Sequence, residues 1–215
     1  MDLRGCYPPA VNLAVTFLTF LALFVPAAWG ASIEATVKDA KGAALEDAVV
    51  WARPKGASLP RVPRDAAVEQ INKTFIPLVT IVQTGTPVRF PNRDEIRHHV
   101  YSFSPAKVFE LKLYAGTPMA PVVFDKPGEV VLGCNIHDHM IGYVFVVDSP
   151  FYGKTGKAGT TKLDNVPAGD YEVHVWHYSQ AAYAEARPVK VDADDAGSAA
   201  FAITTRIMPP RPTPK

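Results

Sequence analysis

The stretch GCNIHDHMIGYVFVV, residues 133–147, decides how the chain is interpreted. It places Cys134, His137 and Met140 within seven positions, directly before an apolar run of strand-forming residues. The run EVVLGC before this segment and the run IGYVFVV within it both have the composition of strands. A tight loop between two strands brings the three side chains around one point, so the pattern predicts a metal site.

The N-terminus has the composition of a secretory signal peptide that ends after Gly30. One arginine precedes the apolar segment VNLAVTFLTFLALFV, and Ala28 and Gly30 occupy the positions that a signal peptidase prefers. An uncleaved N-terminal anchor is the alternative. We therefore expect a periplasmic protein. Loss of Cys6 with the signal peptide would leave Cys134 as a lone thiol in an oxidising compartment. Such a thiol is buried and inert, is a liability, or is bound to a metal.

Composition and charge exclude some functions. About 185 residues remain after signal cleavage, enough for one sizeable domain or two small ones. The formal net charge is +1, without the basic excess that nucleic-acid binding requires. We expect no nucleic-acid partner and no membrane contact after signal cleavage, and the oligomeric state stays open.

Short runs rich in Val, Ile, Thr, Tyr and Phe recur between Gly, Pro, Asp and Asn, which predicts an all-β fold of sandwiches or barrels. These runs are SIEATV, AVVWA, LVTIV, PVRF, FELKLY, EVVLGC, GYVFVV, YEVHVW and FAIT. The segment RDAAVEQINKTF has no apolar face that repeats beyond one helical turn, so we expect strand or loop there. Residues 207–215, IMPPRPTPK, are predicted to form a proline-rich tail.

The fourth metal ligand has to come from elsewhere in the chain. The segment FPNRDEIRHHVYSF offers His98 or His99, where a loop meets a strand. Two imidazoles, one thiolate and a distant thioether form the ligand set of a mononuclear blue-copper site. A structural zinc site prefers four strong nitrogen or sulfur donors, for which methionine is a poor choice. We therefore expect one copper ion.

The residues GCNIHDHM, preceded by NRDEIRHHV, resemble the cupredoxins, in particular the short-loop amicyanin type. The resemblance covers roughly residues 65–148. In that family the first histidine ligand lies six residues after the asparagine of an N-R-x-x-x-x-H stretch. Here Asn92 and Arg93 place His98 at that position. The resemblance thus implies His98, Cys134, His137 and Met140 as ligands.

Two further histidines depart from the family pattern. His99 and His139 are alternates that could replace or add a ligand, and a site with His139 in place of Met140 would hold Cu(II) rather than exchange electrons quickly. We expect both to lie outside the ligand set. Asn92 is predicted to pin the loop that carries His98, and Asn135 to donate its backbone N–H to the sulfur.

Met119, in the loop GTPMAPVVF, is a candidate for the apolar rim around the metal.

The flanking segments have a resemblance of their own. The turn from Asp39 to Gly42 and the run LDNVPAGDY, residues 163–171, look like two halves of a carboxypeptidase regulatory-like (transthyretin-like) β-sandwich. We expect a cupredoxin Greek-key sandwich inserted in or packed beside this split sandwich. The whole resembles the periplasmic proteins named methylamine utilisation protein. The predicted parts are 1–30 (signal peptide), 31–58 and 149–206 (split sandwich), 59–148 (cupredoxin) and 207–215 (tail).

Three functions compete on these grounds. The first is a blue (type 1) copper protein that transfers one electron between periplasmic redox partners, whose identity the sequence does not give. The second is a copper-binding or delivery protein, and the third is a binding module with a structural metal. Nothing in the sequence resembles a hydrolytic triad, so we do not expect an enzyme.

Overall fold

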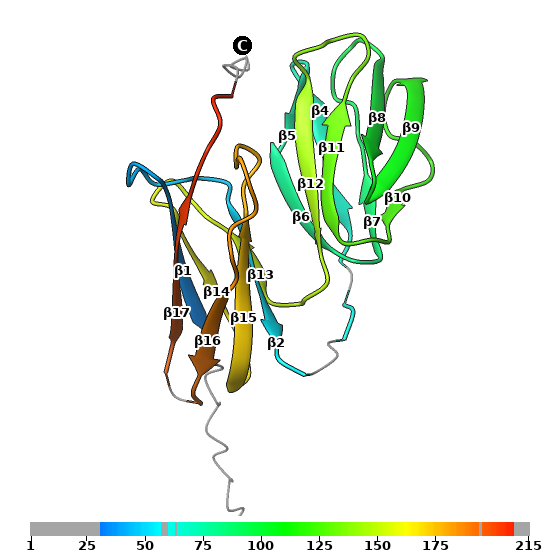
Figure 1. Cartoon of the computed structure of the whole chain (residues 1–215). Helices are drawn as coiled ribbons and strands as arrows, with labels where there is room; N and C mark the ends of the chain where they lie inside the picture. The colour runs from blue at the N-terminus through cyan, green and yellow to red at the C-terminus, as the bar shows by residue number, and fades with distance from the viewer. Residues whose placement is uncertain (1–30, 57–59, 63, 194, 209–215) are drawn as a thin grey trace, which may run out of the picture.

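The computed structural model describes residues 31–56, 60–62, 64–193 and 195–208. The predicted signal peptide and residues 209–215 of the predicted tail lie outside the described residues. Throughout the described ranges the regular structure is β-strand, and the all-β prediction is confirmed (Figure 1). The segment RDAAVEQINKTF forms three short strands, as expected. No helix within the described part of the chain is long and apolar enough to cross a membrane.

The first sandwich is built from strands at both ends of the described chain (Figure 1). Its two sheets have the strand orders β14-β1-β17 and β13-β2-β15-β16, and β1 pairs in parallel with β17. Alternate residues of both sheets share one apolar core, as period-two strands require. The strands are β1 (Ile33–Asp39), β2 (Val49–Pro54), β13 (Tyr152–Lys154), β14 (Thr160–Leu163), β15 (Gly169–Trp176), β16 (Arg187–Val191) and β17 (Gly197–Ile203).

The second sandwich is built from the middle of the chain. Its sheets have the strand orders β6-β12-β11-β8-β9 and β10-β7-β3, and a β4-β5 hairpin lies beside them. Its separate apolar core includes Cys134 and Met140. The strands are β3 (Ala66–Ala67), β4 (Glu69–Ile71), β5 (Thr74–Ile76), β6 (Val79–Gln83), β7 (Thr86–Arg89), β8 (His98–Ser104), β9 (Lys107–Tyr114), β10 (Val122–Phe124), β11 (Gly128–Gly133) and β12 (Ile141–Val147).

The chain leaves the first sandwich after β2, completes the second, and returns to the first at β13. The predicted boundary at residues 148/149 falls in the connection between β12 and β13, and the predicted boundary at 58/59 lies outside the described residues. That the two sandwiches are separate folding units, and that the first is regulatory-like, stay predictions.

Strand β12 is apolar on both faces because it contributes to two cores. Val144 and Val146 point into the core of the second sandwich. Tyr143, Phe145 and Val147 point the other way and pack against β2 and β15 of the first sandwich. In that interface the rings of Phe145 and Trp176 stack with centroids 4.7 Å apart. A strand buried on both faces needs a continuous apolar run, and the run IGYVFVV meets that need.

The carboxyl group of Glu129 lies in this interface on the side of the second sandwich. Burial raises the pKa of Glu129 above its ordinary value of 4.5, although a hydrogen bond from the side chain of Trp176 and the charge of Arg206 act in the opposite direction. The raised pKa means that the folded state binds the proton more tightly than the unfolded state. Ionisation of Glu129 above pH 4.5 therefore reduces the stability of the fold.

We expect Glu129→Gln to be more stable than the wild type at pH 7, because a neutral amide avoids the cost of a partly buried charge. This advantage should shrink as the pH falls below 4.5, where Glu129 is protonated in both states. Urea unfolding at pH 7 and pH 4 measures the difference. Glu172→Gln, at an exposed position on β15, is the matched control. An equal difference at both pH values would contradict the prediction.

Candidate metal centre

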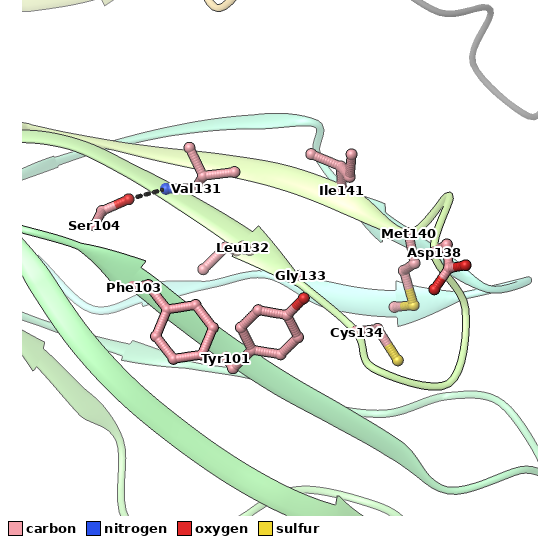
Figure 2. A pocket seen from close by; sticks show the side chains of 10 residues that line it. All are labelled: Tyr101, Phe103, Ser104, Val131, Leu132, Gly133, Cys134, Asp138, Met140 and Ile141. Carbon is pink, nitrogen blue, oxygen red and sulfur yellow. Dashed lines mark hydrogen bonds between the residues drawn. The ribbon is translucent and has the colours of Figure 1, made fainter.

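Three donor side chains converge at one end of the second sandwich. His98 begins β8, Cys134 follows β11, and His137 lies in the loop between β11 and β12. One ligand atom from each lies within 4.8 Å of the other two. Met140 ends the same loop, and its side chain lines a pocket together with Cys134 (Figure 2). The structure thus brings together the four residues that the sequence singles out.

The site is part of the apolar core rather than a surface feature. His98, Cys134 and Met140 are 0%, 2% and 1% exposed, and His137 is partly exposed. The two sulfur-bearing side chains pack in the same cluster as Val100, which follows the first histidines on β8. His137 is therefore the most solvent-exposed of the four side chains.

Pairing between β11 and β12 fixes the ends of the loop. The two strands run antiparallel, and Gly133 pairs with Ile141 directly outside the loop. Within the loop, the backbone N–H of Met140 donates to the carbonyl of His137 at 2.9 Å. This turn keeps His137 and Met140 on a short, closed segment, so their positions follow from the register of the two strands.

The ring of His98 is held in one orientation by Asp94. Its Nε2 lies 2.7 Å from Oδ2 of Asp94, and its Nδ1 lies 3.8 Å from Sγ of Cys134. An ionised carboxylate only accepts hydrogen bonds, so Nε2 has to carry the proton. The lone pair of Nδ1 is then directed at the sulfur, which is the arrangement that a metal between the two atoms requires.

Asp94 itself is fixed by the tip of the β4-β5 hairpin. The backbone N–H groups of Asn72 and Lys73, both at positive φ, donate to its carboxylate at 2.6 and 2.9 Å. Burial by itself would raise the pKa of Asp94, but the hydrogen bonds from Lys73, His98 and Asn72 outweigh burial and lower the pKa below its ordinary value of 3.8. The group is therefore an anion at neutral pH and a strong acceptor for His98.

Asn92 ties the loop before His98 to the rest of the site. Its side-chain amide donates to the carbonyls of Ile96 and Tyr114 at 2.8 and 3.0 Å, and its Oδ1 accepts the backbone N–H of Asp94 at 2.9 Å. The residue is 5% exposed. These bonds fit the predicted pinning role, and an effect of Asn92 on a bound metal stays a prediction.

His137 has a buried ring nitrogen without a hydrogen-bond partner in the described part of the chain: Nδ1. Burial lowers the pKa of His137 below its ordinary value of 6.5, and the charges of His98, Lys73 and His139 lower it further, against the opposing effect of Asp94. The imidazole is then neutral at neutral pH, which is the form that binds metals. An unpaired buried acceptor beside a thiol is costly unless it has such a ligand.

The two alternate histidines lie outside this cluster. His99 points to the other face of the sheet, where its Nε2 lies 3.0 Å from the carboxylate of Glu110 without hydrogen-bond geometry. A register shift between His98 and Val100 accompanies this change of direction along β8. His139 is exposed, and its ring centroid is 5.8 Å from that of His137.

Two other residues that the sequence singles out are exposed. Asn135 is exposed, and its predicted hydrogen bond to the sulfur stays a prediction. Met119 is fully exposed in the loop after Gly116, which pairs with Asn92. A rim function for Met119 is likewise a prediction.

Sequence reasoning missed Asp94 and the hairpin tip. Asp94 lies four residues before His98, so an acid at this spacing was the available signal. The hairpin tip gave no signal of this role, because Asn72 and Lys73 act through backbone N–H groups, which every residue except proline carries.

Comparison with known proteins finds no matching family model and no matching curated protein. Solved structures show partial likeness. A copper-containing nitrite reductase from Thermus scotoductus SA-01 is 25% identical with a TM-score of 0.37, covering 44% of this chain and 25% of the reductase. The chain thus spans a quarter of that protein. A purple cupredoxin from Nitrosopumilus maritimus is 24% identical with a TM-score of 0.35, covering 39% of this chain and 100% of that protein.

A reduced amicyanin variant is 18% identical with a TM-score of 0.34, covering 45% of this chain and 99% of that protein. Cupredoxins are therefore among the similar structures. The regulatory-like resemblance of the flanking segments and the methylamine utilisation name stay predictions.

We expect Asp94→Asn to lower the affinity for Cu(II) by about 10- to 100-fold, the usual cost of losing the partner that orients a histidine ligand. The side chain of asparagine has one acceptor oxygen, whereas the two carboxylate oxygens of Asp94 accept three hydrogen bonds. Competition with a chelator of known affinity measures the change. Glu95→Gln, at the exposed neighbouring position, is the control and should bind as the wild type does. Equal affinities of the Asp94 variant and the control would contradict the role.

Proposed function

We propose that this protein carries single electrons at a mononuclear type 1 copper site formed by His98, Cys134, His137 and Met140. The observation that supports it most is the convergence of one thiol sulfur and two imidazole nitrogens within 4.8 Å, with a buried methionine in the same loop. Bound copper would supply a one-electron couple between Cu(I) and Cu(II).

The donor chemistry fits this metal. A thiolate and two neutral imidazoles suit copper, and a thioether suits the weak fourth position that tunes its potential. The Nδ1 atom of His98 and the unpaired Nδ1 atom of His137 are the nitrogens that would face the metal. Cys134 would bind as the thiolate, the form in which cysteine ligates metals.

The surroundings of the site favour electron transfer over metal delivery. Three of the four side chains are almost fully buried, and Asn92 and Asp94 hold the loop before His98 through several hydrogen bonds. A fixed ligand geometry keeps structural change small when the charge of the site changes by one. A delivery site would instead need donors that a second protein can reach.

We also propose that the protein acts in the periplasm and exchanges electrons with other redox proteins there. The signal-peptide pattern and the single remaining cysteine support this location.

The decisive experiment adds one equivalent of Cu(II) to the purified protein and records visible absorption and electron paramagnetic resonance spectra. We expect an intense thiolate-to-copper band with narrow hyperfine splitting, and its complete loss in Cys134→Ser. His139→Ala is the matched control for a neighbouring imidazole and should keep the band.

A weak absorption with wide splitting, unchanged by Cys134→Ser, would mean that histidines alone hold the metal. The electron-carrier proposal would then fail. Loss of the band in His139→Ala would move His139 into the ligand set.

A further inference from the structure

The outer face of the five-stranded sheet is covered along only part of its width. Its β6 and β12 side packs against the first sandwich through Val79, Tyr143, Phe145 and Val147. The β11, β8 and β9 side of the same face carries exposed apolar side chains, which continue the interface outward. These are Phe103 (79% exposed), Val108 (65%) and Val131 (38%), with Ile141 (40%) at the start of β12.

A groove of about 420 Å³ crosses this exposed face and ends at the metal site. Tyr101, Phe103 and Val131 line its outer part, and Cys134 and Met140 line its inner end (Figure 2). The groove therefore connects the exposed apolar surface directly to the two sulfur ligands, and Asp138 of the loop between β11 and β12 lines it as well.

Tyr101 lies between this surface and the residue before Cys134. It pairs with Gly133 across β8 and β11, and a Cβ at Gly133 would lie only 2.7 Å from Cζ of the tyrosine ring. The ring thus lies directly on the backbone of the residue before Cys134, a contact that glycine alone permits. The ring of Phe103 follows with its centroid 5.1 Å from that of Tyr101.

From this geometry we infer that the face formed by Tyr101, Phe103, Val131 and Ile141 is the docking surface for the electron-transfer partner. The inference rests on the proposed function. An electron would pass between the partner and the thiolate of Cys134 through Gly133 and Tyr101, because tunnelling is faster through packed and bonded atoms than across water. No bond forms and no proton moves: one protein loses an electron and the other gains it.

The charges beside this face indicate the chemistry of the partner. The carboxylate of Glu110 lies 3.0 Å from His99, Lys112 is exposed on the same strand, and Glu129 lies where this face meets the first sandwich. Asp138 lines the groove at its metal end. These groups give the face no dominant sign, so we assign it to a partner protein that presents an apolar, uncharged surface. Association through such a face depends little on ionic strength.

A competing docking surface lies at the end of the sandwich, around the partly exposed His137. Met119 is fully exposed in a neighbouring loop and represents that surface. The two surfaces can be told apart, because Phe103 and Met119 lie in different parts of the chain and neither is in the ligand set. Both are exposed, so their substitution leaves the core intact.

Electron self-exchange tests the inference, with a second copy of this chain as the probe. The copy presents the same apolar face, and the exchange rate between reduced and oxidised copper-loaded protein is measured from NMR line broadening. We expect Phe103→Ser and Tyr101→Leu each to slow self-exchange about tenfold, the effect of truncating a central interface residue. Met119→Ser and Val123→Ser, an exposed valine on β10 in the other sheet, should stay within about twofold of the wild type.

The dependence of the exchange rate on ionic strength and the copper spectrum of each variant provide two further measurements. The rate should change little between low and high ionic strength, and each variant should keep the visible spectrum and the potential of the wild type. Slower exchange in Met119→Ser with an unchanged rate in Phe103→Ser would overturn the inference and assign docking to the end surface. Absence of a thiolate-to-copper band in the wild type would instead overturn the proposed function itself.

Discussion

Strand β12 contributes side chains to two apolar cores, one on each face, and much of the architecture follows from this constraint. One set of alternate residues fills the second sandwich, and the other set packs against β2 and β15 of the first. A shift by one residue would turn the interface set into the core of the second sandwich and the core set toward the first sandwich. The register of β12 is therefore fixed from both sides. Because the loop with His137 and Met140 ends where β12 begins, the position of the site is fixed with it.

The site combines an apolar half and a polar half. Cys134 and Met140 belong to the core of the second sandwich, so packing holds the sulfur atoms. His98 is instead held by a carboxylate, which is itself held by backbone N–H groups of the β4-β5 hairpin. Buried polar atoms usually have a hydrogen-bond partner. In the described part of the chain several buried side-chain atoms lack one, and Nδ1 of His137 is the one among them that belongs to this cluster of donors.

Association of the two sandwiches also determines which surface remains available. The first sandwich covers the outer face of the five-stranded sheet over β6 and β12. Over β11 and β8 the same face stays exposed, with Val131 and Phe103 at its surface. An exposed group of apolar side chains beside a covered part of the same sheet face suits a further protein contact. The flanking sandwich thus shapes the access to the metal site, although it contributes none of the four proposed ligands.

The sequence by itself determined the strands, because period-two alternation and turn residues act over a few positions. It also determined the local set Cys134, His137 and Met140, whose spacing lies within one loop. His98 followed from a family resemblance. Only the tertiary structure decided that His98 turns toward the sulfur and His99 toward Glu110, since the direction of each side chain depends on pairing with β9 and β11. The role of Tyr101 was out of reach of the sequence, and that of Asp94 was signalled only by its spacing from His98. They depend on contacts with a hairpin tip and with Gly133, and such contacts exist only once distant strands have paired.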